Sequence, residues 1–334
     1  MRYDAIIVGG GIAGLTSAAF LTKNGYKILI CEKEEKVGGL VNSFYYDGFL
    51  FDTGVRGILD SGIVKPMLKQ LDLDVELVKS IVTIGIEEEF IRVESTESLY
   101  EYRDMLVKLY PDNENDIDLI IHEIEKIMDY MDILYGIENP LFKDLKNDKE
   151  YLFKTLLPWL FKFMPKYLKI KNFKIPVNDY LSQFTDNQSL IDIISQHFFP
   201  ETPASFALSY FSLYLDYEYP LRGTSDLVEK LKKYINKSAG IIKFDTRIEK
   251  IDSVNKTIFD QNNKKYEYDQ LIWAADLKQL YKAINIEKIK DNRVKQEVKK
   301  QKYVLNDKKG GDSIYSLFLA VDMDKEYFSK KSSG

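Results

Sequence analysis

The fold is decided by residues 3–39, which read YDAIIVGGGIAGLTSAAFLTKNGYKILICEKEEKVGG. Residues 5–8 form an apolar, largely β-branched run without helical spacing, a pattern that predicts a buried parallel strand. Residues 15–24 are rich in Ala and Leu and end before Gly25, which predicts a helix with a glycine stop. A second apolar strand is expected over residues 27–31. This order of elements predicts a βαβ unit at the start of an α/β fold.

The turn between the first strand and the helix is a G-x-G-x-x-G sequence with its glycines at Gly9, Gly11 and Gly14. Gly9 allows the tight turn, Gly11 lets backbone approach a pyrophosphate, and Gly14 lets the helix pack close to the strand. The first N–H groups of the helix, those of Ile12 and Ala13 among them, are then free to bind phosphate at the positive end of the helix dipole.

An acidic residue stands where a dinucleotide site needs one. Glu32 lies 18 residues beyond Gly14, at the tip of the second strand, where a carboxylate can accept hydrogen bonds from a ribose diol. The same carboxylate would repel a 2′-phosphate, which argues against NADP. A βαβ unit that binds no nucleotide is the alternative, and the strand, helix and acid around the glycines argue against it.

The segment after Glu32 carries a family resemblance. Gly38 and Gly39 follow it in an E-x5-GG spacing, and residues 51–54 read FDTG. This continuation resembles the FAD-binding N-terminus of the phytoene desaturase and flavin amine oxidase superfamily. The resemblance implies FAD as the cofactor, with the Gly-Gly turn beside its phosphates and the F-D-x-G segment running toward the flavin. It also implies contacts at Lys33, Leu40 and Gly54. The family usually has Arg or Lys where this chain has Leu40, and Arg56 is the alternative source of that charge.

The resemblance continues in a second block. Residues 220–223, PLRG, correspond to a Pro-x-Gly-Gly turn that opens a helix, with Arg222 in place of the first Gly. Residues 248–251 correspond to a strand whose backbone faces the adenine, and residues 272–276 to a strand that returns to the FAD. This block implies cofactor contacts at Ile248 and Ala274.

The amino-acid composition limits which kinds of protein this chain can be. The 334 residues are 45% hydrophobic and 30% charged, as in a water-soluble globular protein of two lobes. The net charge of −5 gives no reason to expect nucleic-acid binding. Cys31 is the single cysteine, which excludes an internal disulfide and fits a reducing compartment. His122 and His197 lack companions at metal-ligand spacing, so no metal site is predicted.

No signal peptide and no apolar run of membrane-spanning length is found in the sequence. The predicted location is therefore the cytoplasm, with a peripheral position at a membrane left open. No oligomeric state is predicted.

The order of patterns along the chain predicts two interleaved lobes. A discontinuous, Rossmann-type FAD-binding domain is expected over residues 1–75 and 216–290, and an α+β substrate domain over residues 76–215 and 291–334. Within them we expect antiparallel strands in residues 76–100, an amphipathic helix with core-facing isoleucines from Ile117 to Ile127, and a helix over residues 225–235 capped by Ser225. Residues 313–322 are expected to form a strand.

Residues 151–174, YLFKTLLPWLFKFMPKYLKIKNFK, interleave aromatic residues with lysines and contain no acid. Two interpretations remain open. One is an interfacial membrane helix in which lysines extend beside apolar rings. The other is a pair of surface helices broken at Pro158 and Pro165, with the aromatic rings packed on the lobe. Residues 207–215, ALSYFSLYL, form a small and aromatic run that is expected to face a pocket.

The resemblance favours an FAD-dependent oxidoreductase that transfers hydride to or from CH–CH bonds of an apolar, polyene- or isoprenoid-like substrate. The alternatives are an amine or protoporphyrinogen oxidase-type flavoenzyme and a catalytically incomplete FAD-fold binding protein. No residue stands out as a catalytic acid or base. In the family a C-terminal Gly-Asp segment closes over the FAD. No such segment is found before Gly334. We therefore expect either a truncated chain that holds FAD weakly by itself, which is the favoured interpretation, or an FAD site that is completed differently.

Overall fold

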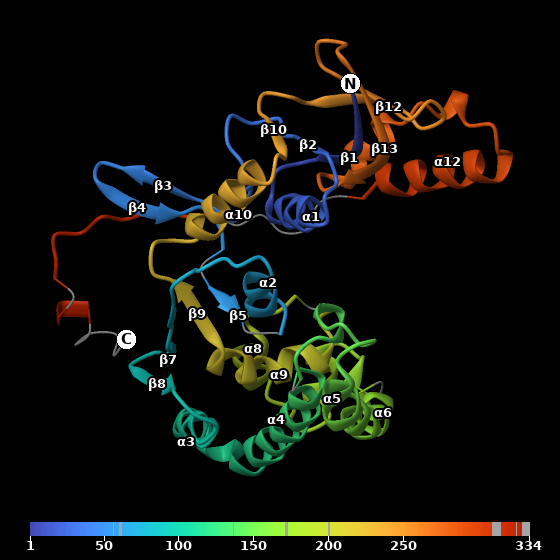
Figure 1. Cartoon of the computed structure of the whole chain (residues 1–334). Coiled ribbons are helices and arrows are strands. Elements are labelled where there is room, and N and C mark those ends of the chain that lie inside the picture. The colour runs from blue at the N-terminus through green and yellow to red at the C-terminus, as the bar shows by residue number, and fades with distance from the viewer. Residues whose placement is uncertain are drawn as a thin grey trace. The chain divides into compact units, whose positions relative to one another are not determined.

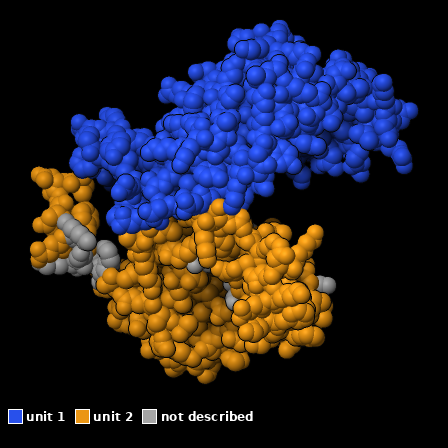
Figure 2. Space-filling model, viewed as in Figure 1, with its two compact units in different colours: residues 1–56, 71–76, 220–320 blue, residues 57–70, 77–219, 321–334 orange. Residues whose placement is uncertain are grey.

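The computed structural model divides into two compact units (Figures 1 and 2). It describes residues 1–55, 57–59, 62–135, 137–170, 173–199, 201–308, 315–324 and 326–328. Unit 1 comprises residues 1–56, 71–76 and 220–320, and unit 2 comprises residues 57–70, 77–219 and 321–334. Residues 291–320 thus group with unit 1, whereas the sequence-based division placed them in the substrate domain. The roles assigned to the two domains remain predictions.

Unit 1 is built on a six-stranded sheet in the order β10-β2-β1-β13-β12-β11. Strand β1 pairs in parallel with both β2 and β13, and β2 pairs in parallel with β10, while β12 runs antiparallel to its neighbours. The strands are β1 (Arg2–Val8), β2 (Ile28–Cys31), β10 (Ile241–Lys243), β11 (Ile248–Asp252), β12 (Thr257–Asp260) and β13 (Lys265–Trp273). The predicted α/β class with a parallel, Rossmann-type sheet is confirmed.

The sheet forms because its central strands are apolar on both faces, as parallel strands covered by helices must be. Ile6, Ile7, Ile28 and Ile30 are completely buried. The helices of unit 1 are α1 (Ile12–Lys23), α10 (Ser225–Lys237), α11 (Leu277–Ala283) and α12 (Asn292–Asn306), with the short helix η5 (Ile286–Lys288). A separate hairpin, β3 (Ser43–Tyr46) and β4 (Phe49–Asp52), follows the first βαβ unit.

Unit 2 is mainly helical, with two small sheets, β5-β9-β6 and β7-β8. Its strands are β5 (Ile58–Leu59), β6 (Leu77–Lys79), β7 (Val82–Ile86) and β8 (Glu89–Val93), and β9 (Tyr217–Pro220) reaches the boundary with unit 1. Its helices are α2 (Val64–Gln70), α3 (Ser98–Leu109), η1 (Pro111–Asn113), α4 (Glu114–Tyr135), η2 (Pro140–Phe142), α5 (Lys149–Tyr151), the π-helical η3 (Leu152–Leu156), α6 (Leu157–Ile170), α7 (Val177–Leu181), α8 (Gln188–Ser195) and α9 (Ala204–Leu215). The amphipathic helix is confirmed, because Ile117, Ile120, Ile124 and Ile127 of α4 are all buried.

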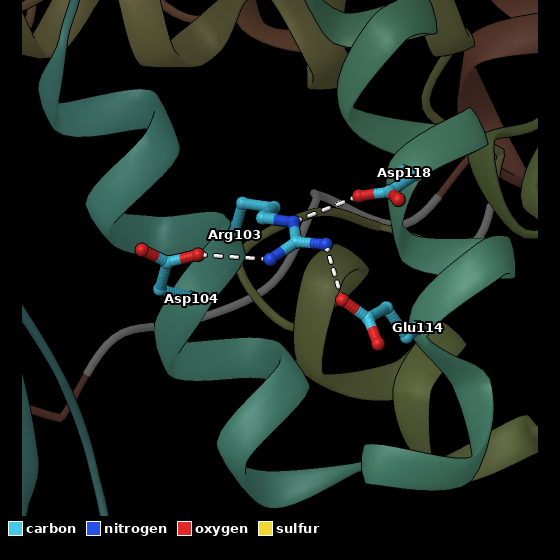
Figure 3. A network of polar contacts seen from close by, with 4 residues as sticks. All are labelled: Arg103, Asp104, Glu114 and Asp118. Carbon is cyan, nitrogen blue, oxygen red and sulfur yellow. Dashed lines mark hydrogen bonds and ion pairs between the residues drawn. The ribbon is translucent and has the colours of Figure 1, made fainter.

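Helices α3 and α4 of unit 2 are joined by one arginine. Figure 3 shows the Arg103 guanidinium between carboxylates of both helices. Its Nε donates to Asp118 at 2.7 Å, its Nη2 to Glu114 at 2.7 Å and its Nη1 to Asp104 at 3.0 Å. The hydrogen bond from Arg103 lowers the pKa of Asp118. The planar guanidinium suits this role because its donors point in fixed, divergent directions.

Two local expectations were wrong. Residues 315–322, the described part of the expected strand 313–322, form no strand, and Phe318 instead packs on Phe44 and Phe51 at ring distances of 5.2 and 5.3 Å. Ser225 does not cap α10 but is its first residue, and the cap position belongs to Thr224, whose side chain has other partners. Apolar alternation and a serine at a helix start are local signals, and tertiary partners overrode both.

We expect Asp252→Asn to remove an acid-sensitive part of the stability. Hydrogen bonds from Lys288, at 2.5 Å, and from Asn255 lower the pKa of the Asp252 carboxyl from 3.8 to about 2. Because the pKa is lower in the folded chain, this contribution is complete above about pH 4 and is lost as the pH falls toward 2. The unfolding temperature of the wild type should therefore fall more steeply across this range than that of the variant. Equal slopes would contradict the assignment, and Asp186→Asn, at an exposed carboxylate, is the control.

Candidate functional site

The turn between β1 and α1 is closed by two glycines that no larger residue can replace. Gly9 has a φ of +103°, and a Cβ there would lie 2.5 Å from the carbonyl oxygen of Ala274. A Cβ at Gly14 would overlap with the carbonyl oxygen of Gly9. The Ala274 N–H donates to the Val8 carbonyl at 2.8 Å. The structure therefore brings Ala274, at the end of β13, directly against the glycine-rich turn.

Gly11 is different because the space over it is open. Its backbone is extended, with φ −70° and ψ 178°, and a Cβ there would have no described atom within 4 Å. Gly11 is the N-cap of α1, and no side chain caps that helix. Ala13, in the first turn, is exposed. Free N–H groups at an open helix N-terminus attract an anion such as a phosphate.

The Gly-Gly turn lies beside this open turn. The Gly38 N–H donates to the Gly10 carbonyl at 2.8 Å, and a Cβ on Gly39 would lie 3.4 Å from the Cα of Gly11. Gly38 and Gly39 have φ values of +117° and +59°, a region that glycine adopts without strain. Residues 28 positions apart in the sequence thus form one backbone surface.

Glu32 fixes the tip of β2 at the same place. Its side chain is buried, and its two carboxylate oxygens accept the Gly10 N–H at 2.5 Å and the Glu34 N–H at 3.0 Å. Lys33 is exposed and pairs with Glu34 at 3.1 Å. The Glu32 carboxylate thus contacts the same turn that presents Gly11, so a buried carboxylate and an open helix N-terminus are adjacent.

The remaining predicted residues lie at the edges of this surface. The loop before β11 reaches the tip of β2, where the Thr246 N–H donates to the Glu32 carbonyl at 2.8 Å, but the Ile248 side chain is buried in the core. The Ile248 side chain is therefore not available to a ligand. Leu40 is 76% exposed, and a Cβ on Gly54 would lie 3.1 Å from its carbonyl oxygen. Arg56 lies outside the described residues.

One residue that joins the two motif blocks was not singled out from the sequence. The Oδ1 atom of Asp52 accepts the Ser43 hydroxyl at 2.6 Å, the Thr224 N–H at 3.0 Å and the Thr224 hydroxyl at 3.0 Å. The Thr224 hydroxyl also lies 3.1 Å from the Asn42 carbonyl. Asp52 thus ties the FDTG segment to the turn before α10. The sequence feature that could have identified Asp52 is its position within residues 51–54, FDTG.

Unit 2 contains a cavity of about 620 Å³ that opens beside α9. Its lining comes from β7, α9, β9, residues 196–199 and Thr202. Aromatic rings dominate it, and no Asp, Glu, Lys or Arg is among the described lining residues, which are Val82, Thr83, Ile84, Gly85, Gln196, His197, Phe198, Phe199, Thr202, Phe206, Tyr210, Tyr214 and Tyr217. The expectation that residues 207–215 face a pocket is confirmed. Cavities of this size and lining suit a mainly apolar small molecule.

Tyrosines supply much of the polarity of this cavity. The hydroxyl groups of Tyr210 and Tyr217 form a hydrogen bond of 2.9 Å. Burial raises the pKa of Tyr214 to about 12 and also raises the pKa of Tyr217. These phenols stay neutral at physiological pH. The rings of Phe198, Phe206 and Tyr210 meet edge to face at 5.3 to 6.3 Å, which gives the wall a fixed shape.

Comparison with known proteins places this geometry in context. Residues 7–71 match the NAD(P)-binding Rossmann-like domain. The chain is 23% identical over 355 residues to the all-trans-retinol 13,14-reductase of Danio rerio, an alignment that covers 98% of this chain and 56% of that protein. It is 38% identical over 64 residues to the 4,4′-diapophytoene desaturase of Staphylococcus haemolyticus, covering 19% of this chain and 13% of the desaturase. A solved oxidoreductase from Methanosarcina mazei superposes with a TM-score of 0.60 at 15% identity, covering 91% of this chain and 65% of that chain.

These matches confirm the resemblance to phytoene desaturase-type proteins that the motifs indicated, and they confirm the Rossmann-like fold. The family match describes dinucleotide-binding domains in general. The chain spans about half the length of the reductase, 56% of it.

Proposed function

We propose that this chain carries the dinucleotide site and an apolar substrate site of an FAD-dependent oxidoreductase that acts on CH–CH bonds of a polyene- or isoprenoid-like molecule. The observation that carries the proposal is the open backbone surface of Gly11, Gly38 and Gly39 beside the buried Glu32 carboxylate. Its elements fit the two ends of an ADP moiety: N–H donors for the pyrophosphate and an acceptor for the ribose.

The residues of the open turn would hold FAD in the following way. The α1 N-terminus binds the pyrophosphate, and Glu32 orients the ribose and excludes a 2′-phosphate. When bound, FAD supplies the flavin ring that accepts or gives up a hydride. The chain itself contributes position and electrostatics.

An apolar substrate is supported by the cavity beside α9. Its lining has no charged Asp, Glu, Lys or Arg among the described residues, and the half-buried Tyr214 and Tyr217 stay neutral. Burying the apolar surface of a polyene there is favourable by about 25 cal/mol per Å² of that surface. The names of two sequence relatives state activities on all-trans-retinol and on diapophytoene, which are substrates of this chemical class.

Retinol binding to the purified chain tests the substrate proposal. We expect all-trans-retinol to bind and to quench protein fluorescence, because aromatic rings line the cavity. Phe199→Glu, at a lining residue that is 63% exposed, should weaken binding at least about tenfold by placing a charge beside an apolar ligand. Phe153→Glu, at a ring 62% exposed that is not among the lining residues, is the matched control.

Two outcomes would overturn the proposal. Equal retinol binding by both variants would place the ligand outside this cavity. Bleaching of the FAD-loaded chain by amines but not by polyenes, followed anaerobically by absorbance, would select an amine-oxidising flavoenzyme.

A further inference from the structure

Helix α6 of unit 2 has an apolar face that its own unit leaves uncovered. Leu160, Met164 and Leu168 recur every four residues and Phe161 adjoins them, so these side chains share one side of the helix. Their exposed fractions are 36%, 52%, 57% and 80% for Leu160, Met164, Leu168 and Phe161. Phe153, in the preceding π-helical turn, is 62% exposed. We call Leu160, Phe161, Met164 and Leu168 the α6 outer face.

The opposite side of α6 holds the helix onto α4, its neighbour in Figure 1. Trp159 donates its indole N–H to the Ile133 carbonyl at 2.5 Å and stacks on Phe163 at 4.5 Å. Lys166 donates to the Asp129 carbonyl at 3.1 Å. The helix runs through Pro165 without a break, so the predicted break at this proline is wrong, whereas the predicted packing of aromatic rings on the lobe is confirmed for Trp159. The outer face is therefore not needed to attach α6 to its unit.

The charges beside the outer face have one sign. Lys162 and Lys169 are exposed and lie seven residues apart, which puts them on the same side of α6, next to the apolar stripe. Residues 151–174 contain no acid, although the whole chain has a net charge of −5. An apolar stripe edged by lysines complements a surface with an apolar interior beneath a negatively charged outer layer.

We propose that the α6 outer face docks on the surface of an anionic lipid bilayer, with the helix axis in the plane of the membrane. The apolar side chains enter the boundary of the acyl chains while Lys162 and Lys169 bind lipid phosphates. The helix lies on the bilayer and does not cross it: its 14 residues span about 21 Å, less than the hydrocarbon core of about 30 Å. Across the part of the chain that the structure describes, no helix is long and apolar enough to traverse a bilayer.

A second copy of the chain is the competing occupant, and the charges disfavour it. In a two-fold symmetric dimer both copies use the same surface, so Lys162 and Lys169 of each copy would be gathered at one interface. Like charges brought together across an interface oppose association. A bilayer with phosphate headgroups instead offers opposite charge along the whole helix.

Vesicle co-sedimentation of the full chain tests the proposal. We expect binding to phosphatidylcholine vesicles that contain phosphatidylglycerol and much weaker binding to pure phosphatidylcholine. Phe161→Ser with Leu168→Ser should reduce binding at least about tenfold through lost apolar burial. Lys162→Glu with Lys169→Glu should reduce it to a similar degree through charge reversal. The matched controls lie on α12: Tyr303→Ser with Val304→Ser, and Lys299→Glu with Lys300→Glu, all at exposed positions.

Retention of vesicle binding by the controls and its loss in both α6 variants would support the proposal. Failure of the wild type to bind, or equal binding by the α6 variants, would overturn it. Light scattering without lipid measures the oligomeric state and so tests the other occupant. The α6 outer face would be assigned to a second copy if the wild type forms a dimer and binds no vesicles, and if Phe161→Ser with Leu168→Ser makes that dimer dissociate. Circular dichroism should give the same helix content for every variant, because the substituted side chains are exposed.

Discussion

Gly11→Val should abolish FAD binding while the chain still folds. The φ of −70° suits any residue, and a Cβ at this position has no described atom within 4 Å. The valine methyl groups would occupy the open space at the α1 N-terminus where a pyrophosphate is proposed to bind. Losing two charge-assisted hydrogen bonds, at about 1.5–3 kcal/mol each, weakens binding by about a hundredfold or more. Calorimetric titration with FAD measures the affinity, and circular dichroism checks the fold.

Two other substitutions to valine make this experiment specific. Gly14→Val should disrupt the fold itself, because its Cβ would overlap with the Gly9 carbonyl oxygen. Lys300→Val introduces the same side chain at an exposed position of α12 and should leave FAD binding unchanged. A Gly11→Val chain that binds FAD like the wild type would refute the assigned site. A wild-type chain that binds NAD but no FAD would refute the proposed cofactor.

The first βαβ unit could be predicted from the sequence because its signals are local. The apolar strand runs, the glycine stop at Gly25 and the spacing of Gly9, Gly11 and Gly14 depend only on neighbouring residues, and β1, α1 and β2 are found where they were expected. The isoleucine stripe of α4 was predictable for the same reason, since its helical period repeats over several turns.

Long-range partners could not be predicted. The sequence patterns assigned residues 313–322 to a strand, but a strand requires a partner edge, and Phe318 instead packs on the rings of the β3–β4 hairpin. Likewise, the spacing that suggested Ser225 as a cap contained no sign that the Thr224 hydroxyl is engaged by Asp52 and Asn42. Contacts between residues about 170 positions apart leave no local pattern.

The role of Asp52 follows from those contacts, and Asp52→Ala should lower the free energy of unfolding of unit 1 by about 2–4 kcal/mol. Thr224 is only 1% exposed, so its N–H would lose a buried acceptor, at about 1–3 kcal/mol, whereas its hydroxyl keeps the Asn42 carbonyl as an acceptor. The Ser43 hydroxyl would lose its 2.6 Å bond as well. Asp52→Asn retains one oxygen acceptor and should cost less than Asp52→Ala.

Chemical denaturation combined with hydrogen exchange of the unit 1 amides measures this loss of stability. Glu249→Ala, at an exposed position of β11, is the matched control, and we expect it to change the free energy of unfolding by no more than about 0.5 kcal/mol. If Asp52→Ala and Glu249→Ala had equal stability, the Asp52 contacts would be incidental. If Asp52→Ala is less stable than Glu249→Ala, the main role of the FDTG segment is to stabilise the structure. It then holds the β3–β4 hairpin and the start of α10 together, on the same stretch of chain that continues to the Gly38–Gly39 turn. In that case a motif that resembles a cofactor signature supplies the rigidity of the loop that the cofactor is proposed to contact.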